Sequence, residues 1–164
     1  MNVELVPLGL EAATQLAADP AAFAARAGVD FGPNAEVARD VATQTVAHVG
    51  RTGDSAPWGG YIAVSSPGRL VVGTCAFVAP PAEGMVEIAY FTFPGGEGRG
   101  VATTMARALL DIARAAPEVR TVRAHTLPAD GPSPRILEKL AFERVGDAED
   151  ADAGRVWRWE RGAT

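Results

Sequence analysis

The chain has few of the residues that cross-link a small protein or bind a metal ion. Cys75 is its only cysteine, so an intrachain disulfide is excluded. Its two histidines, His48 and His125, lie far apart and form no Cys/His spacing of the kind that binds zinc. The residues around Cys75 are apolar, which predicts a thiol buried in a strand rather than a nucleophile. We therefore expect no metal site.

Positive charge is also scarce, and long apolar runs are missing. The 20 acidic residues outnumber the 15 lysines and arginines, which gives a formal net charge of -5. A nucleic-acid-binding surface needs clustered basic residues, so we expect no nucleic-acid partner. No apolar segment approaches the length of a membrane span, and the start lacks a basic region followed by an apolar stretch. We expect a cytoplasmic protein without a membrane partner.

The composition is that of a folded protein. Hydrophobic residues make up 48% of the 164 residues and charged residues 21%, which is too apolar for a disordered chain. The length is typical of one domain, and neither a repeat nor a linker interrupts it. We expect a single domain over residues 1–164.

Hydrophobic periodicity predicts alternating strands and helices, an order that indicates a mixed α/β sheet. Asn34 is expected to cap a helix that ends at Gly50, and Ser133 to cap a later helix with Pro134 at its first position. The other expected helices are Leu10 to Ala18, Ala21 to Ala27, and a run from Val101 that Pro117 closes. The expected strands are Val3 to Leu8, Tyr61 to Ser65, Leu70 to Val78, Met85 to Phe93, Val119 to Thr126, Phe142 to Val145 and Arg155 to Trp159, the last two around an acidic turn.

A glycine-rich run at residues 97–102 joins the fourth strand to the helix that begins at Val101. Glycines let a ligand approach the backbone closely, and the amides of a helix start are donors for an anion, so we expect a pyrophosphate cradle. The alternative to a phosphate-binding loop is a flexible connection that only lets the strand and the helix pack closely. A nucleotide-hydrolase loop would need Lys and then Ser or Thr where Val101 and Ala102 follow Gly100. The dinucleotide fingerprint fits poorly too, since Val101 or Thr103 stands where it needs a small residue.

Residues 97–102 do resemble the acyl-CoA loop of the GNAT acetyltransferases, which reads Gln or Arg, two residues, Gly, one residue, then Gly or Ala. The Val-Glu-Ile-Ala-Tyr segment at residues 86–90 is similar to a strand of the branch that includes ribosomal-protein N-terminal acetyltransferases. Residues 133–142 resemble that branch's helix and its Leu-Gly-Phe ending, and residues 125–128 and 156–160 resemble recurrent pieces of one subgroup. The resemblance covers the chain from Leu70 onward.

This resemblance implies the GNAT fold, a mixed and mostly antiparallel central sheet flanked by helices. The central strands from Met85 and Val119 would splay apart and admit the coenzyme between them. The implied activity is an N-acetyltransferase that moves the acetyl group of acetyl-CoA to a primary amine, of a small molecule or a peptide N-terminus, by direct attack. Homodimers are common in the family, so a homodimer is compatible with it. The residues implied to bind the coenzyme are Glu97, Gly98, Arg99, Gly100, Val101, Ala102 and Ser133.

The chain departs from the family pattern at three places. Glu97 replaces Gln or Arg and adds negative charge beside a polyanionic ligand. The Asn that commonly precedes the serine helix is absent, since Asp130 or Gly131 takes its place. The tyrosine that many members use near the thiol maps to Leu137, so a tyrosine acid from this helix is not expected. These departures leave two alternatives open, a non-catalytic acyl-CoA-binding sensor or partner module and an unrelated α/β binding domain.

Four residues are candidates for catalysis or acceptor binding. Glu87 is the first candidate base, because it is the only acid in an apolar strand; the alternative is a carboxylate facing solvent or paired with an arginine. Ser133 is a candidate to bond the thiol or donate a proton, with a purely capping role as the alternative. Trp58 and Tyr61 border the region where the family binds its acceptor, as an aromatic wall or as core residues.

Overall fold

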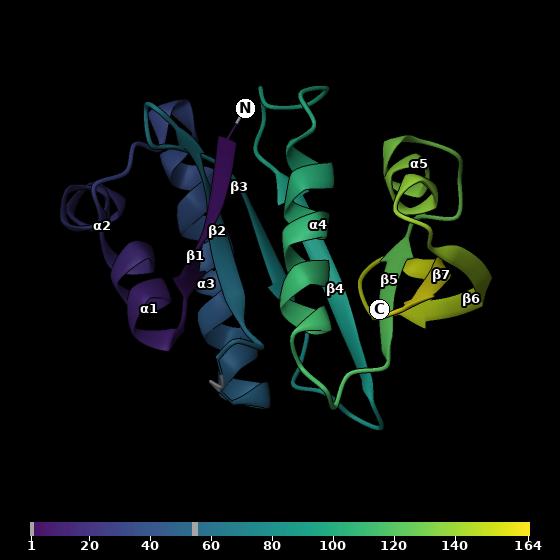
Figure 1. Ribbon diagram of the computed structural model, residues 1–164. Helices are drawn as coiled ribbons and strands as arrows, with labels where there is room; N and C mark the ends of the chain where they lie inside the picture. Colours follow the sequence, from purple (N-terminus) through teal and green to yellow (C-terminus); the bar gives the residue numbers. More distant parts are fainter. Residues whose placement is uncertain (1, 54–55) are drawn as a thin grey trace.

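The computed structural model describes residues 2–53 and 56–164, within which seven strands form one sheet in the order β1-β2-β3-β4-β5-β7-β6 (Figure 1). Neighbouring strands are antiparallel except β4 and β5, which run parallel. The expected mixed, mostly antiparallel sheet is therefore confirmed. The strands are β1 (Asn2–Leu8), β2 (Gly60–Ser66), β3 (Leu70–Phe77), β4 (Met85–Thr92), β5 (Thr121–Thr126), β6 (Glu143–Asp150) and β7 (Gly154–Gly162).

Helices cover both faces of this sheet, and the alternation of β2 shows why. Tyr61 and Ala63 point into a core shared with α4, whereas Ile62 and Val64 point into a second core shared with α1 to α3. Figure 1 shows α4 on one face and α1 to α3 against the other face at the N-terminal half of the sheet. The helices are α1 (Leu10–Ala18), α2 (Pro20–Ala27), the 3-10 turn η1 (Gly32–Asn34), α3 (Ala35–Thr52), α4 (Val101–Arg114) and α5 (Pro132–Lys139).

The parallel pairing between β4 and β5 is short. It joins three residue pairs and ends with Glu87 beside Arg123. Beyond that point β4 stays paired with β3, through Gly73 and Thr92, and β5 stays paired with β7. The two strands diverge above this point, where Figure 1 shows β5 and α5 standing apart from β4. We call this opening the fork, and it is the splay that the family resemblance implied.

One expected helix boundary and one expected side-chain cap were wrong. The helix α3 runs through Gly50 and ends at Thr52, with Gly53 after it; a glycine inside an exposed helix only weakens it, so Gly50 is not a terminator. Asn34 does hold the position before α3, but its side chain makes no cap. Its Nδ2 donates to the carbonyl of Pro94 at 3.2 Å instead, which ties the start of α3 to the loop after β4.

Ser133 is not the N-cap of its helix, which corrects the second cap assignment. The helix α5 begins at Pro132, with Gly131 in the cap position and no side-chain cap bond. Either Pro132 or Pro134 suits the first turn, since both have the φ of a helix, and the chain uses the earlier one. Ser133 therefore lies inside the first turn, where its hydroxyl is not needed as a cap.

The last hairpin is longer than expected. β6 and β7 extend to Asp150 and Gly154, so most of the supposed acidic turn belongs to a strand. The remaining turn is closed by the Asp150 carboxylate, which accepts from the backbone N–H groups of Asp152 and Ala153 at 2.8 and 2.9 Å. These two bonds lower the pKa of Asp150.

None of the helices in the described ranges is both long and apolar enough to cross a membrane.

Cys75 lies on β3 with 4% of its surface exposed, as its apolar neighbours predict. Burial raises the pKa of its thiol to about 12. Almost no thiolate then forms at a pH of about 8. We expect the native protein to remain unreactive toward an aromatic disulfide reagent over minutes, and the denatured chain to react at one thiol. Rapid titration of one thiol in the native protein would contradict this burial.

Candidate active site

Glu87 lies on β4 at the vertex of the fork, and its side chain contacts the facing strand. Oε2 of Glu87 is 3.0 Å from Nδ1 of His125 on β5. The two side chains are 30% and 21% exposed, so both are partly withdrawn from water while remaining accessible. Glu87 is the last β4 residue paired with β5, so this contact bridges the strands where their backbone pairing stops. The partner of Glu87 is thus a histidine rather than the arginine that the sequence left open.

Further charged residues share this face of the sheet. Residues in register on neighbouring strands point to the same side, and His125 is in register with Arg158 on β7. Nε of Arg158 donates to Nε2 of His125 at 3.4 Å. Arg123, the register neighbour of Glu87, is held by Glu160 at 2.7 Å. This face of the sheet therefore carries two separate contacts. Arg158 holds His125, and Glu160 holds Arg123.

At the fork, two hydroxyl groups meet on the other face of the sheet from Glu87. Tyr90 is on β4, and its hydroxyl oxygen lies 3.2 Å from Oγ of Ser133 in α5. Burial raises the pKa of Tyr90, an effect that the hydrogen bond with Ser133 partly offsets. The phenol is consequently protonated at neutral pH and can donate. Leu137, which replaces the family tyrosine, is fully buried.

The glycine-rich loop has the conformation that a phosphate-binding turn needs. Gly98 and Gly100 have φ of +77° and +78°, and a Cβ at either position would meet nothing within 4 Å. Gly100 precedes α4 without a side-chain cap, so the first amides of this helix are open donors. The carboxylate of Glu97 turns back and accepts from the N–H of Gly95 at 2.9 Å. Residues 97–100 are exposed, and they fit a polyanion without moving core side chains.

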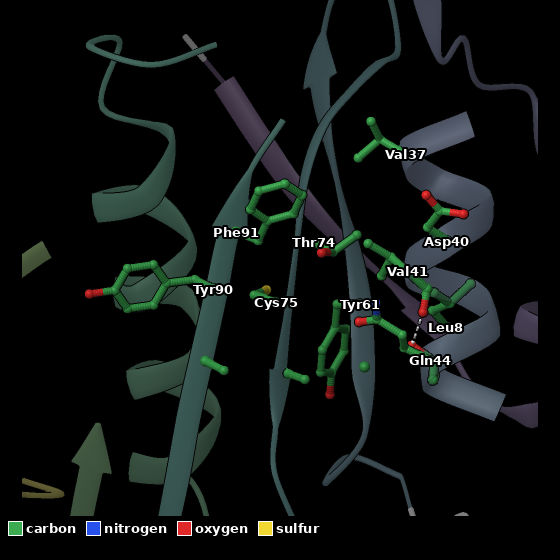
Figure 2. Close-up of a pocket in the computed structure, with 14 residues that line it drawn as sticks. Leu8, Val37, Asp40, Val41, Gln44, Tyr61, Thr74, Cys75, Tyr90 and Phe91 are labelled. Carbon is green, nitrogen blue, oxygen red and sulfur yellow. Dashed lines mark hydrogen bonds between the residues drawn. The ribbon is translucent and has the colours of Figure 1, made fainter. Parts of the chain in front are cut away.

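Two adjoining hollows separate α3 from the sheet, with volumes of about 560 and 610 Å³. Figure 2 shows the first, between α3 and strands β2 to β4, with Asp40 and Gln44 reaching in from the helix. Both hollows share Gln44, and the first reaches Ala89, two residues along β4 from Glu87. We call them together the α3 groove. It lies on the same side of β4 as Glu87, because residues two apart in a strand point the same way.

The two aromatic candidates line different parts of the α3 groove. Tyr61 borders the first hollow, is 7% exposed, and donates from its hydroxyl to the carbonyl of Pro57 at 2.6 Å. Trp58 borders the second hollow and packs edge-on against Phe77, with ring centroids 4.9 Å apart. Both residues border the groove, but both rings pack into the core that the sheet shares with α4, so their role in acceptor binding stays a prediction.

Apart from Trp58 and Tyr61, the structure places the predicted site residues at three positions around the fork. Glu87 lies at the vertex, Ser133 on the α5 side, and residues 97–102 at the start of α4. His125 and Tyr90 were not predicted as site residues, although both occur in segments that resemble the family. The alternation of β4 was a usable signal for Tyr90, since it turns residues 86, 88 and 90 toward α4 and α5. Among the described residues, no group of three or more His, Cys, Asp or Glu is arranged to hold a metal ion.

Solved structures share this architecture. The chain superposes on the aminoglycoside acetyltransferase AAC(6')-Ib in complex with paromomycin and acetyl-CoA with a TM-score of 0.68 and 18% identity, covering 99% of this chain and 94% of that one. Mutant forms of the spermidine/spermine N-acetyltransferase SpeG from Vibrio cholerae give a TM-score of 0.66, 11% identity, and coverage of 99% and 95%. The ribosomal alpha-N-protein acetyltransferase RimL gives a TM-score of 0.56 and 14% identity, and the match covers 76% of this chain and 79% of that one.

Sequence comparisons identify the family. Comparison with curated proteins gave no match. The family profile for the acetyltransferase (GNAT) domain, however, matches residues 3–143, which is most of the chain. The fork and the glycine loop before α4 lie within the matched residues, and the fold agrees with that of the solved acetyltransferases. The chain therefore belongs to the GNAT acetyltransferase family and is an acetyl-CoA-dependent acyltransferase.

Proposed function

We propose that the protein transfers the acetyl group of acetyl-CoA to a primary amine, on a small molecule or a peptide N-terminus, by direct attack of the amine on the thioester. The observation that carries this proposal is the position of Glu87, a partly buried carboxylate at the vertex of the fork. The α3 groove reaches the same side of β4 and has room for an acceptor. An amine entering through the groove would therefore reach a proton acceptor beside the fork.

Proton transfer defines the role of Glu87. An amine is protonated at neutral pH and attacks only after it loses a proton, so the reaction needs a base near the nitrogen. Glu87 accepts this first proton directly or through one water and releases it to solvent. The nitrogen then bonds to the acetyl carbon, the carbon–sulfur bond breaks, and the second proton that the nitrogen loses goes to Glu87 in turn. Glu87 returns this proton to solvent, to which its side chain is 30% exposed.

Tyr90 and Ser133 support the departure of the thiolate. The leaving sulfur needs a proton, and the two hydroxyls lie 3.2 Å apart on the α5 side of the fork. Ser133 would donate its proton to the sulfur and recover one from Tyr90, whose raised pKa keeps it protonated before the transfer. Tyr90 would regain its proton from solvent, to which it is partly exposed. This pair takes the place of the family tyrosine that Leu137 replaces.

Residues 97–102 would bind the pyrophosphate through backbone amides. The left-handed Gly98 and Gly100 turn the chain so that the N–H groups of Val101 and Ala102 point outward at the positive end of α4. The carboxylate of Glu97 accepts from the N–H of Gly95, which fixes its position in the loop while it keeps its negative charge.

The lining of the α3 groove supports an acceptor with an apolar body. Its first hollow is formed largely by apolar side chains, among them Leu8, Val41 and Phe91. Asp40 is the carboxylate among its described lining residues, and the chain has a net charge of -5. Both features favour a cationic acceptor over an anionic one.

The substitution Glu87→Gln tests the proposed reaction. Loss of the base should reduce kcat by about 100-fold or more, while the affinity for acetyl-CoA stays unchanged. Thiol release is measured with an alkylamine, a diamine, an aminoglycoside and a peptide with a free N-terminus. Glu118→Gln, at an exposed site after α4, is the matched control and should retain the wild-type rate.

Either of two results would contradict the proposal. A Glu87→Gln variant with wild-type kcat would exclude Glu87 as the base. Coenzyme binding without thiol release with every amine would favour the alternative of a non-catalytic acyl-CoA-binding module.

A bulky residue at Gln44 tests the assignment of the acceptor site. Gln44 lies on the exposed side of α3 and borders both hollows of the groove. We expect Gln44→Trp to raise KM for the amine by about tenfold or more, since filling an apolar pocket displaces bound substrate, and to leave coenzyme affinity unchanged. Thr43→Trp, on a neighbouring exposed residue outside the groove, is the control. Equal KM values for the two variants would place the acceptor elsewhere.

A further inference from the structure

His125 forms a side-chain link between three strands at the place where the sheet opens. It lies two residues beyond Arg123, the last β5 residue paired with β4. Nδ1 of His125 faces Oε2 of Glu87 on β4 at 3.0 Å, and Nε2 faces Nε of Arg158 on β7 at 3.4 Å. The backbone no longer fixes the position of β4 relative to β5 here, so the side chains do.

The partners of His125 determine which ring nitrogen carries its proton. Arginine has only donors, so Nε2 must accept the hydrogen bond from Arg158. In the neutral ring the proton is then on Nδ1, which donates to Oε2 of Glu87. The second carboxylate oxygen of Glu87 takes no part in the hydrogen bond with His125.

The other charged groups near His125 preserve this arrangement. Arg123, in register with Glu87, donates from Nε and Nη2 to Glu160 at 2.8 and 2.7 Å and is thereby held away from Glu87. A guanidinium bound to Glu87 would compete with the amine proton for the carboxylate. Asp150 on β6 also lies within electrostatic range of His125. His125 is then the donor on one oxygen of Glu87.

We propose that His125 is a positioning residue for the acetyl transfer, fixed in its Nδ1-protonated form by Arg158, and that it aims the free oxygen of Glu87 at the amine. This inference rests on the proposed function, because it assigns how the base is held. It adds two residues, His125 and Arg158, that contact neither the substrate nor the coenzyme in the proposed reaction.

The ring form of His125 is measured by nitrogen NMR of the imidazoles. The chain has only two histidines, so a His125→Leu variant assigns both sets of signals. We expect a protonated Nδ1 and an unprotonated Nε2 in the neutral ring of His125 in the wild type, and a shift toward the other tautomer in Arg158→Leu. A wild-type ring protonated on Nε2 alone would overturn the proposal, whether or not an acceptor amine is known.

Kinetics of two variants with the same side-chain branching test the effect on the reaction. Leu and Asn both carry four side-chain heavy atoms that branch at Cγ, but only Asn can donate a hydrogen bond to Glu87. We expect His125→Leu to lower kcat about ten- to a hundredfold, as small misplacements of a reacting group do, with KM and coenzyme affinity unchanged. His125→Asn should recover most of the rate. Circular dichroism confirms that both variants are folded.

The outcomes separate this inference from the function on which it rests. Equal kcat values for His125→Leu and the wild type, with Glu87→Gln inactive, would overturn the role of His125 and leave the base in place. Equal losses in His125→Leu and His125→Asn would also overturn it, since a donor at this position would then have no effect. A wild-type protein that acetylates no amine would refute the proposed function, and with it the catalytic purpose of the link.

Discussion

The site depends on one constraint, the early end of backbone pairing between β4 and β5. Each strand remains fixed by its outer neighbour, β3 or β7, so the strands can part without unfolding. Their facing edges then present backbone groups that need other hydrogen-bond partners. An extended ligand with amide groups can supply them, and α4 begins beside the same opening with uncapped amides. The open strand edges and the start of α4 therefore offer hydrogen-bonding groups of the kind that a coenzyme with amides and phosphates needs.

Side chains replace the missing backbone pairing on both sides of the fork. Glu87 reaches His125 on one side, and Tyr90 reaches Ser133 on the other. Glu87 and Tyr90 come from the same strand but point to opposite faces, because their positions differ by an odd number. One strand therefore supplies the proposed proton acceptor for the amine and the proposed proton source for the thiolate, and keeps the two functions apart.

The sequence predicted the elements better than it predicted the contacts. Strong periodicity and the glycine loop predicted β4 and α4, and apolarity predicted the burial of Cys75. β6 was cut short because nearly all its residues are exposed, so no alternation of burial marks it as a strand. The pairing of Glu87 with His125, 38 residues later, depends on register between strands, which local pattern does not contain.

The most direct test of this account is calorimetric titration of the protein with acetyl-CoA, beside a Gly100→Glu variant. A carboxylate and a strained left-handed residue at the start of α4 should abolish binding that is micromolar in the wild type. Gly28→Glu makes the same change at another left-handed glycine, after α2, and should bind normally. Equal affinity of the wild type and Gly100→Glu, or no binding at all, would contradict the assignment of the coenzyme to this loop and fork.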